Sequence, residues 1–129
     1  MPASAAVFLA KAEESLTGAE SEFANGRYNN CANRCYYACF QAAVAALLQA
    51  AVQPRGAQWS HTFVQGQFVG QLINRRKIYS GDIRDVLART QLLRHMADYE
   101  YEQVSEVQAY RALRRARQFL AAIKGGENT

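Results

Sequence analysis

The residues that could do chemistry are concentrated at positions 94–101, which read RHMADYEY. If this stretch is helical, Arg94 and Asp98 lie four residues apart and share one face. Tyr99 and Tyr101 add two phenol groups to the same short stretch. A guanidinium can bind a phosphate, and a carboxylate beside it can hold it in place. The stretch therefore predicts either a small polar site or a structural contact that ties this helix to its neighbour.

A second polar and aromatic cluster occupies positions 33–40, which read NRCYYACF. Asn33 and Arg34 are too polar for the interior of a helical bundle unless they are paired. Tyr37 and Phe40 lie three residues apart and would line one face of a helix. We expect this cluster to pack against the arginine- and tyrosine-containing stretch described above.

His61 is a third candidate because it directly follows Ser60, a good N-cap residue for a helix. The helix dipole disfavours the charged form of a histidine at this end. His61 could therefore serve as a neutral ligand or hydrogen-bond partner. An exposed or capping histidine is the alternative interpretation.

Cys31, Cys35 and Cys39 follow one another at intervals of four residues, so they share one stripe of a helix. Three thiolates could begin a zinc site. However, a single helix cannot surround a tetrahedral ion, and neither His61 nor His95, the two histidines of the chain, is an obvious fourth ligand. We therefore expect small buried side chains that allow close packing, and neither a metal nor another cofactor.

The composition is typical of a folded protein, since half of the 129 residues are hydrophobic, a fifth are charged and two are proline. We expect one domain over residues 1–126, followed by a polar tail at 127–129. The longest apolar run, Ala42 to Val52, is too short for a membrane span. The N-terminus lacks the features of a signal peptide, and three cysteines, an odd number, argue against a secreted disulfide scaffold. The expected location is the cytoplasm.

The net charge of +4 is mildly basic. Five cations without an acidic residue among them gather near the C-terminus: Arg111, Arg114, Arg115, Arg117 and Lys124. A basic helix face of this kind can hold a polyanion. A solvated helix surface is the alternative.

Apolar residues recur at helical spacing along the whole chain, and no alternating strand pattern occurs. A first helix is expected to end at Asn25-Gly26, and a second is expected to span about residues 28–52. In the third helix, Gly66 and Gly70 are expected to let a bulky neighbour approach, such as an aromatic ring of the second helix.

The remaining helices are marked by their expected ends. The N-caps predicted for the third, fourth and fifth helices are Ser60, Asp82 and Ser105. Ser105 and Gln108 also fit a capping box, and Gly125-Gly126 is expected to close the fifth helix. Short connections favour antiparallel neighbours, so the predicted fold is an all-α, up-and-down antiparallel bundle of four to five helices.

Taken in order, these clusters resemble the HEPN superfamily of helical domains, in particular its small stand-alone bacterial and archaeal members. The second helix of those proteins typically reads N-R-x-Y-Y-A-x-F-x-A-A-x-A-L-L; residues 33–48 read NRCYYACFQAAVAALL, with one extra residue before the leucines. They commonly carry Ser-His at the next helix, here Ser60-His61, and then R-x-x-A-D-Y, here residues 94–99. An alanine and an aromatic residue near the end of the final helix match residues 116–119. The resemblance covers essentially the whole chain and implies an HEPN-like bundle.

Active HEPN ribonucleases carry R-x4-6-H, often extended as R-x4-H-x-Y, and their arginine and histidine meet across a homodimer interface. Counted from Arg94, Tyr99 stands at the histidine position and Tyr101 at the position of the final tyrosine. A second register pairs Arg89 with His95, but the A-D-Y sequence favours Arg94, and the other two would face away from each other on a helix. Tyrosine is a poor base at neutral pH because its pKa is about 10. The motif thus keeps its phosphate-binding half and weakens its acid–base half.

The resemblance implies two alternative functions. In the first, the chain is the partner of a minimal nucleotidyltransferase in a two-gene module that resembles a toxin–antitoxin pair, and AMP is attached to the motif tyrosine, here Tyr101. The second function is a metal-independent ribonuclease that uses Arg94, Asp98 and Tyr99. The first is favoured because the motif histidine is missing. A homodimer is expected in both, with RNA or nucleotide contacts from Arg94, Tyr101, Asn33, Arg34 and His61.

Overall fold

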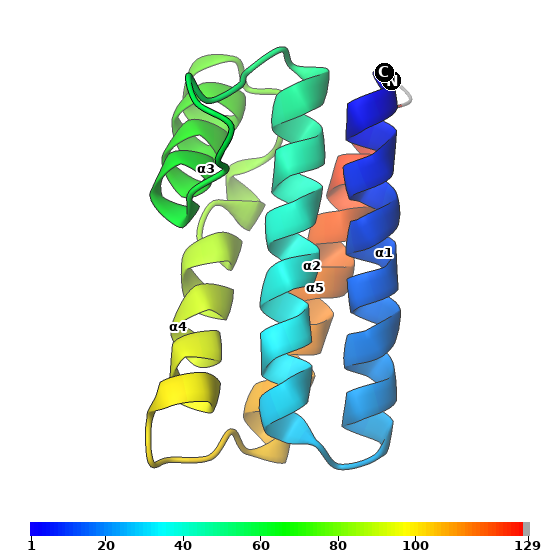
Figure 1. Ribbon diagram of the computed structural model, residues 1–129, viewed down its shortest axis with the longest axis vertical. Coiled ribbons are helices and arrows are strands. Elements are labelled where there is room, and N and C mark those ends of the chain that lie inside the picture. The colour runs from blue at the N-terminus through cyan, green and yellow to red at the C-terminus, as the bar shows by residue number, and fades with distance from the viewer. Residues whose placement is uncertain (128–129) are drawn as a thin grey trace.

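The computed structural model describes residues 1–127, which form a bundle of helices (Figure 1). Three long helices run side by side, the first opposite in direction to the other two, and a shorter helix lies beside the central one. In chain order the elements are α1 (Ala3–Ala24), α2 (Tyr28–Gln49), α3 (His61–Gln67), the π-helical η1 (Phe68–Arg75), the 3-10 helix η2 (Gly81–Ile83), α4 (Val86–Tyr99) and α5 (Glu106–Glu127). The expected all-α bundle is confirmed, with five α-helices among these residues.

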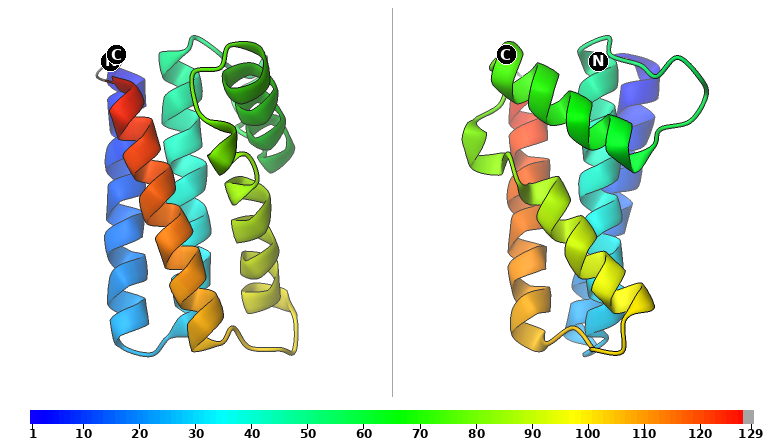
Figure 2. Two further views of the ribbon diagram at one scale, coloured as in Figure 1. Left: turned by 180° about the vertical axis from the view of Figure 1, so that it is seen from behind. Right: turned by 90° about the vertical axis from the view of Figure 1, so that its left-hand side faces the viewer.

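The core is centred on α2, which contacts α1, α4 and α5 (Figures 1 and 2). In its middle stretch, residues 42–47, no residue exposes more than 2% of its surface. Four of these six residues are alanine, and small side chains let several helices approach α2 at once. The cysteines Cys31, Cys35 and Cys39 are free and buried in the same core, as expected for packing residues. Among the described residues, no group of three or more His, Cys, Asp or Glu side chains is arranged to hold a metal ion.

The end of α2 differs from its prediction. The helix stops at Gln49 rather than near Val52, because the Val52 N–H turns back and donates to the Leu47 carbonyl at 2.8 Å. This closure requires Ala51 to adopt a φ of 60°, the left-handed conformation that usually ends a helix at glycine. Alanine and valine continue a helical pattern, so the sequence alone placed the end too late.

The third helix begins as predicted, because the Phe63 N–H donates to the Ser60 hydroxyl at 3.1 Å. At Phe68 the α-helix widens into the π-helical η1 instead of continuing. The expectation for Gly66 and Gly70 is wrong, since a Cβ atom at either position would meet nothing within 4 Å. No aromatic ring of α2 approaches them.

The cap predicted for the fourth helix is also wrong. The Asp82 N–H donates to the Ser80 hydroxyl at 3.1 Å, so Ser80 caps η2, and α4 begins only after Asp85. Ser80-Gly81-Asp82 is a turn, as its residue types predict, but Asp82 lies inside that turn rather than at the start of α4.

The capping box of α5 is confirmed in both directions. The Gln108 N–H donates to the Ser105 hydroxyl at 3.1 Å, and the Ser105 N–H donates to the Gln108 side-chain oxygen at 2.9 Å. Gly125 does not close this helix, which continues to Glu127. The rest of the predicted polar tail, positions 128–129, lies outside the described residues. Within residues 1–127, no helix is both long enough and apolar enough to cross a lipid bilayer.

Candidate functional site

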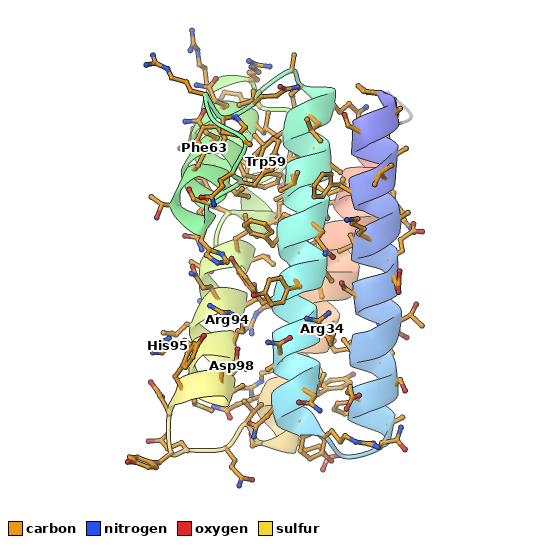
Figure 3. The ribbon with its side chains drawn as sticks, viewed as in Figure 1. Arg34, Trp59, Phe63, Arg94, His95 and Asp98 are labelled. Atoms are coloured by element: carbon orange, nitrogen blue, oxygen red, sulfur yellow. The ribbon has the colours of Figure 1, made fainter. Side chains whose placement is uncertain are left out.

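The candidate site lies where α4 faces α2. Figure 3 shows that Arg94 and Asp98 project from α4 toward α2, whereas His95 projects away from α2. The helical spacing of the first two residues explains this, because side chains four residues apart lie on one face. The same spacing brings the Arg94 Nη1 atom within 3.3 Å of the Asp98 Oδ2 atom.

A polar chain continues from Asp98 to α2. The Asn33 amide nitrogen donates to Asp98 Oδ2 at 3.1 Å, and the Asn33 amide oxygen accepts from Arg34 Nη2 at 2.8 Å and Nε at 3.1 Å. Asn33 and Arg34, which were expected to need partners, are paired with each other, and Asn33 connects them with Asp98. Two guanidinium groups thus flank one carboxylate and one amide at the contact between the helices.

Arg94 is also surrounded by aromatic rings. Its guanidinium carbon lies 5.3 Å from the centre of the Tyr36 ring, 5.8 Å from that of Tyr37 and 5.9 Å from that of Tyr99. Each such cation–π contact contributes about 0.5–2 kcal/mol, depending on its exposure to water. Only 12% of the Arg94 side chain is exposed, so the guanidinium is surrounded mainly by aromatic rings and contacts little water.

The donors of Arg94 are only partly used. Its Nε atom is buried and has no hydrogen-bond partner among the described residues, and the single bond to Asp98 at 3.3 Å is long. A hollow of about 260 Å³ between α3 and α4 borders the arginine, and Gln65, Gln91 and His95 also line it. An anion with several oxygens that entered this hollow would supply the missing acceptors.

His61 joins the cluster through a residue that sequence reasoning did not single out. The hydroxyl of Tyr36, a fully buried residue of α2, is hydrogen-bonded to His61 Nδ1. Burial, and secondarily the charge of Arg94, lower the pKa of His61 below its usual 6.5, and burial raises the pKa of Tyr36. At neutral pH the phenol is therefore the donor and the neutral imidazole is the acceptor. A tyrosine within a small-residue core stretch needs a partner for its hydroxyl, and that need was the available signal.

The structure brings together six of the seven predicted site residues: Arg94, Asp98, Tyr99, Asn33, Arg34 and His61. Tyr101 stands apart, in the link between α4 and α5, and its side chain is fully exposed. Tyr99 is half in the cluster, because its ring packs against His95 at 5.1 Å between ring centres while 69% of the residue remains exposed.

The alternative register is not assembled within this chain. Arg89 pairs with Asp85 at 2.6 Å, and the side chains of both are more than half exposed. Arg89 lines a groove between α4 and α5, whereas His95 lines the hollow beside Arg94. The two residues thus face different surfaces, as their spacing on the helix predicts.

The C-terminal basic cluster is partly neutralised by α1. Arg117 lies 3.1 Å from a Glu20 carboxylate oxygen, and Lys124 lies 2.5 Å from one of Glu13. The absence of acidic residues between Arg111 and Lys124 was therefore misleading, since acidic residues of the neighbouring helix supply the counter-charges. Within this cluster, Arg111, Arg114 and Arg115 form no ion pair with a described residue.

Two comparisons with known proteins bear on this site. No curated protein sequence matches the chain. The model of the family described as HEPN domain matches residues 5–126, which include every residue of the Arg94 cluster. Because the match spans nearly all of the 129 residues, the chain belongs to the HEPN domain family.

Proposed function

We propose that this HEPN domain protein binds a phosphate group of RNA or of a nucleotide at Arg94. The proposal rests on the surroundings of the Arg94 guanidinium. Aromatic rings position it, its Nε–H has no hydrogen-bond acceptor among the described residues, and it borders a hollow. A buried N–H without an acceptor costs about 1–3 kcal/mol, and a bound anion would recover part of this cost after a small rotation of the side chain. A preorganised guanidinium also loses little entropy on binding.

We further propose that the chain is the partner of a minimal nucleotidyltransferase in a two-gene, toxin–antitoxin-like module, and that Tyr101 is the residue it modifies. The exposure of Tyr101 supports this role, because a second protein must reach the phenol oxygen from solvent. In the transfer, that oxygen attacks the α-phosphate of ATP, pyrophosphate leaves, and the phenol proton passes to a base. Adding AMP would place a new phosphate close to the C-terminal end of α4.

The test is incubation of the purified protein with a minimal nucleotidyltransferase and ATP, followed by intact-mass measurement. The expected product is heavier by one AMP. The Tyr101→Phe variant should remain unmodified, and the Tyr99→Phe variant, which removes the other exposed phenol of the motif, should react normally. Modification of the Tyr101→Phe variant, or no modification of the unaltered protein, would contradict the proposal.

A metal-independent ribonuclease is the second candidate function, and the position of two histidines supports it. His61 lies in the Arg94 cluster and His95 borders the same hollow, so acid–base groups stand near the arginine although Tyr99 occupies the motif position. Cleavage needs a base for the 2′-hydroxyl proton and an acid for the leaving oxygen. Rapid RNA cleavage in EDTA that is lost in both His61→Ala and His95→Ala would favour this function over the partner role. Weak cleavage or none is the result expected from the partner role.

A further inference from the structure

A groove between α4 and α5 is the strongest unassigned feature of the surface, and Leu92 separates it from the hollow beside Arg94 and borders both. We propose that it is the docking site for an acidic amphipathic helix of a partner protein. The groove has a volume of about 430 Å³ and runs between one stripe of each helix. Figure 2 shows α4 inclined to α5, with both helices at the surface of the bundle. The proposal does not depend on phosphate binding at Arg94.

The α4 side of the groove is apolar. Leu92, Leu93 and Met96 line it. The last two are partly buried against the core, but Leu92 exposes 73% of its surface to water. Leu92 and Met96 lie four residues apart on one face, and Leu93 adds a side chain next to them, so about one turn of α4 lines the groove with apolar groups. Covering an exposed leucine removes apolar surface from water, which favours binding by about 25 cal/mol for each Å² covered.

The α5 side of the groove is cationic. Gln108, Arg111 and Arg115 line it, and the two arginines lie four residues apart on one face. Like charges at this spacing repel and destabilise a helix, and neither arginine forms an ion pair with a described residue. Glu100 is the one carboxylate in the lining. This side therefore presents an excess of positive charge next to the apolar face.

At the end of the groove near the start of α4, Arg89 already forms an ion pair with a carboxylate. It pairs with Asp85, whose pKa is lowered first by its hydrogen bond to Arg89 and more weakly by the charge of Arg115. Because Asp85 has one close partner in Arg89, its influence on Arg115 is minor. The charges left to attract a partner are thus those of Arg111 and Arg115.

An amphipathic helix fits these two sides because it carries apolar residues on one face and charged residues beside them. Its apolar face would cover Leu92 and Met96, and acidic residues at its edge would meet Arg111 and Arg115. A symmetric second copy of the chain fits less well, because a two-fold axis here would bring arginines toward arginines. Single-stranded RNA also fits less well, because no aromatic ring lines the groove and bases bind such sites by stacking.

The experiment uses the full chain and fluorescence anisotropy with labelled probes. The first probe is a peptide of about 18 residues, long enough to form a helix, with leucines at i, i+3, i+4 and i+7 and glutamates at the flanking positions. The second replaces every glutamate by lysine, and the third is a single-stranded RNA of similar length. The variants are Arg111→Glu combined with Arg115→Glu, and Leu92→Ser. The matched controls are Arg114→Glu on the same helix and Val107→Ser, both exposed and outside the groove.

The acidic peptide should bind saturably and the lysine peptide should not. Affinity for the acidic peptide should fall by about tenfold or more in either groove variant and by less than about twofold in either control, with circular dichroism unchanged. Three results would overturn the proposal: no saturable binding of the acidic peptide, equal losses in Arg114→Glu, or RNA binding that depends on the groove while peptide binding does not. Dissociation of a dimer by the groove variants would also overturn it, because the groove would then be an interface between copies of the chain. Loss of binding at Arg94 alone would leave this proposal intact.

Discussion

Arg94 and Arg89 lie on the same helix but in opposite environments, and this difference can be measured. Arg94 is 12% exposed and lies among three aromatic rings, whereas the Arg89 side chain is 58% exposed. Replacing Arg94 by alanine removes these ring contacts and leaves Asp98 without its cationic partner. We expect the free energy of unfolding to fall by about 1–3 kcal/mol. The Arg89→Ala variant loses a surface ion pair and should change by about 0.5 kcal/mol or less.

Urea denaturation of the two variants tests the stability difference, and anisotropy with labelled RNA tests the binding role. RNA affinity should be lost in Arg94→Ala and kept in Arg89→Ala. If the two variants behave alike in both measurements, Arg94 is not the arginine of the site.

His61 should make the stability of the protein depend on pH. Its pKa in the folded state is lowered from 6.5, chiefly by burial, so below that pH the unfolded chain binds the proton more readily than the folded chain. Stability is therefore expected to be retained above about pH 6.5 and lost progressively as the pH falls below it. Arg94 faces the same ring and opposes its protonation.

The measurement is the urea midpoint at about pH 7.5 and about pH 5.5. The drop between them should be smaller in His61→Gln than in the unaltered protein. The His95→Gln variant is the control, because that residue is exposed. An equal drop in His61→Gln would show that other groups cause the pH dependence.

Part of this site could be predicted from the sequence. The rest could not, because it depends on how separate helices pack against each other. The pairing of Arg94 with Asp98 could be predicted because it depends only on helical spacing. The bond from Asn33 to Asp98 joins residues on two helices, so it requires the relative position of α2 and α4. The bond from Tyr36 to His61 depends on how the start of α3 docks on α2, which no local pattern specifies.

Among the helices, the end of α2 offers a clear test of backbone strain. Ala51 has a φ of 60°, and a side chain in this conformation costs about 1 kcal/mol or more relative to glycine. The Ala51→Gly variant should therefore be more stable by about 0.5–1 kcal/mol, after the greater entropy of glycine in the unfolded chain is subtracted.

The control is the Ala50→Gly variant, because the φ of Ala50 is −86° and alanine is unstrained there. Its thermal midpoint should stay the same or fall, while that of Ala51→Gly should rise. A lower midpoint for Ala51→Gly would mean that the left-handed turn is not kept in solution.

The helices were easier to predict than their ends. Apolar spacing identifies the buried faces of α1 and α5, because burial itself imposes that spacing. The turn after η1 is different, since the Leu72 carbonyl accepts from the N–H groups of both Ile78 and Tyr79, at 2.8 and 3.3 Å. Such a closure depends on backbone geometry rather than on the apolar pattern. For the same reason, Asp82 was assigned as a cap although it belongs to the turn that precedes α4.

At the scale of the whole molecule, the proposed homodimer is the next quantity to measure. Tyr99 at the Arg94 cluster and Tyr101 in the link after α4 expose large rings, and a symmetric dimer would bring two copies of residues 94–101 together. Light scattering at micromolar concentration should give about twice the chain mass of 14.4 kDa. The Tyr99→Asp variant should shift the mass toward that of one chain.

The Val107→Asp variant provides the matched control for the dimer. Val107 is also an exposed apolar residue, at 56%, but lies on α5 rather than in the motif. Its mass should remain that of the dimer. A single-chain mass for the unaltered protein, or equal dissociation of both variants, would rule out the proposed interface.

The buried middle of α2, residues 42–47, also affects when the protein can fold during its synthesis. A ribosome releases α2 well before α5, although α5 is one of the helices that cover it. Until the last helix emerges, the apolar residues 42–47 remain partly exposed to water. A nascent chain with exposed apolar surface is prone to aggregate or to be bound by chaperones. We therefore expect folding to be completed only after synthesis of α5. A premature stop in the link after α4 should yield an insoluble fragment rather than a smaller folded domain.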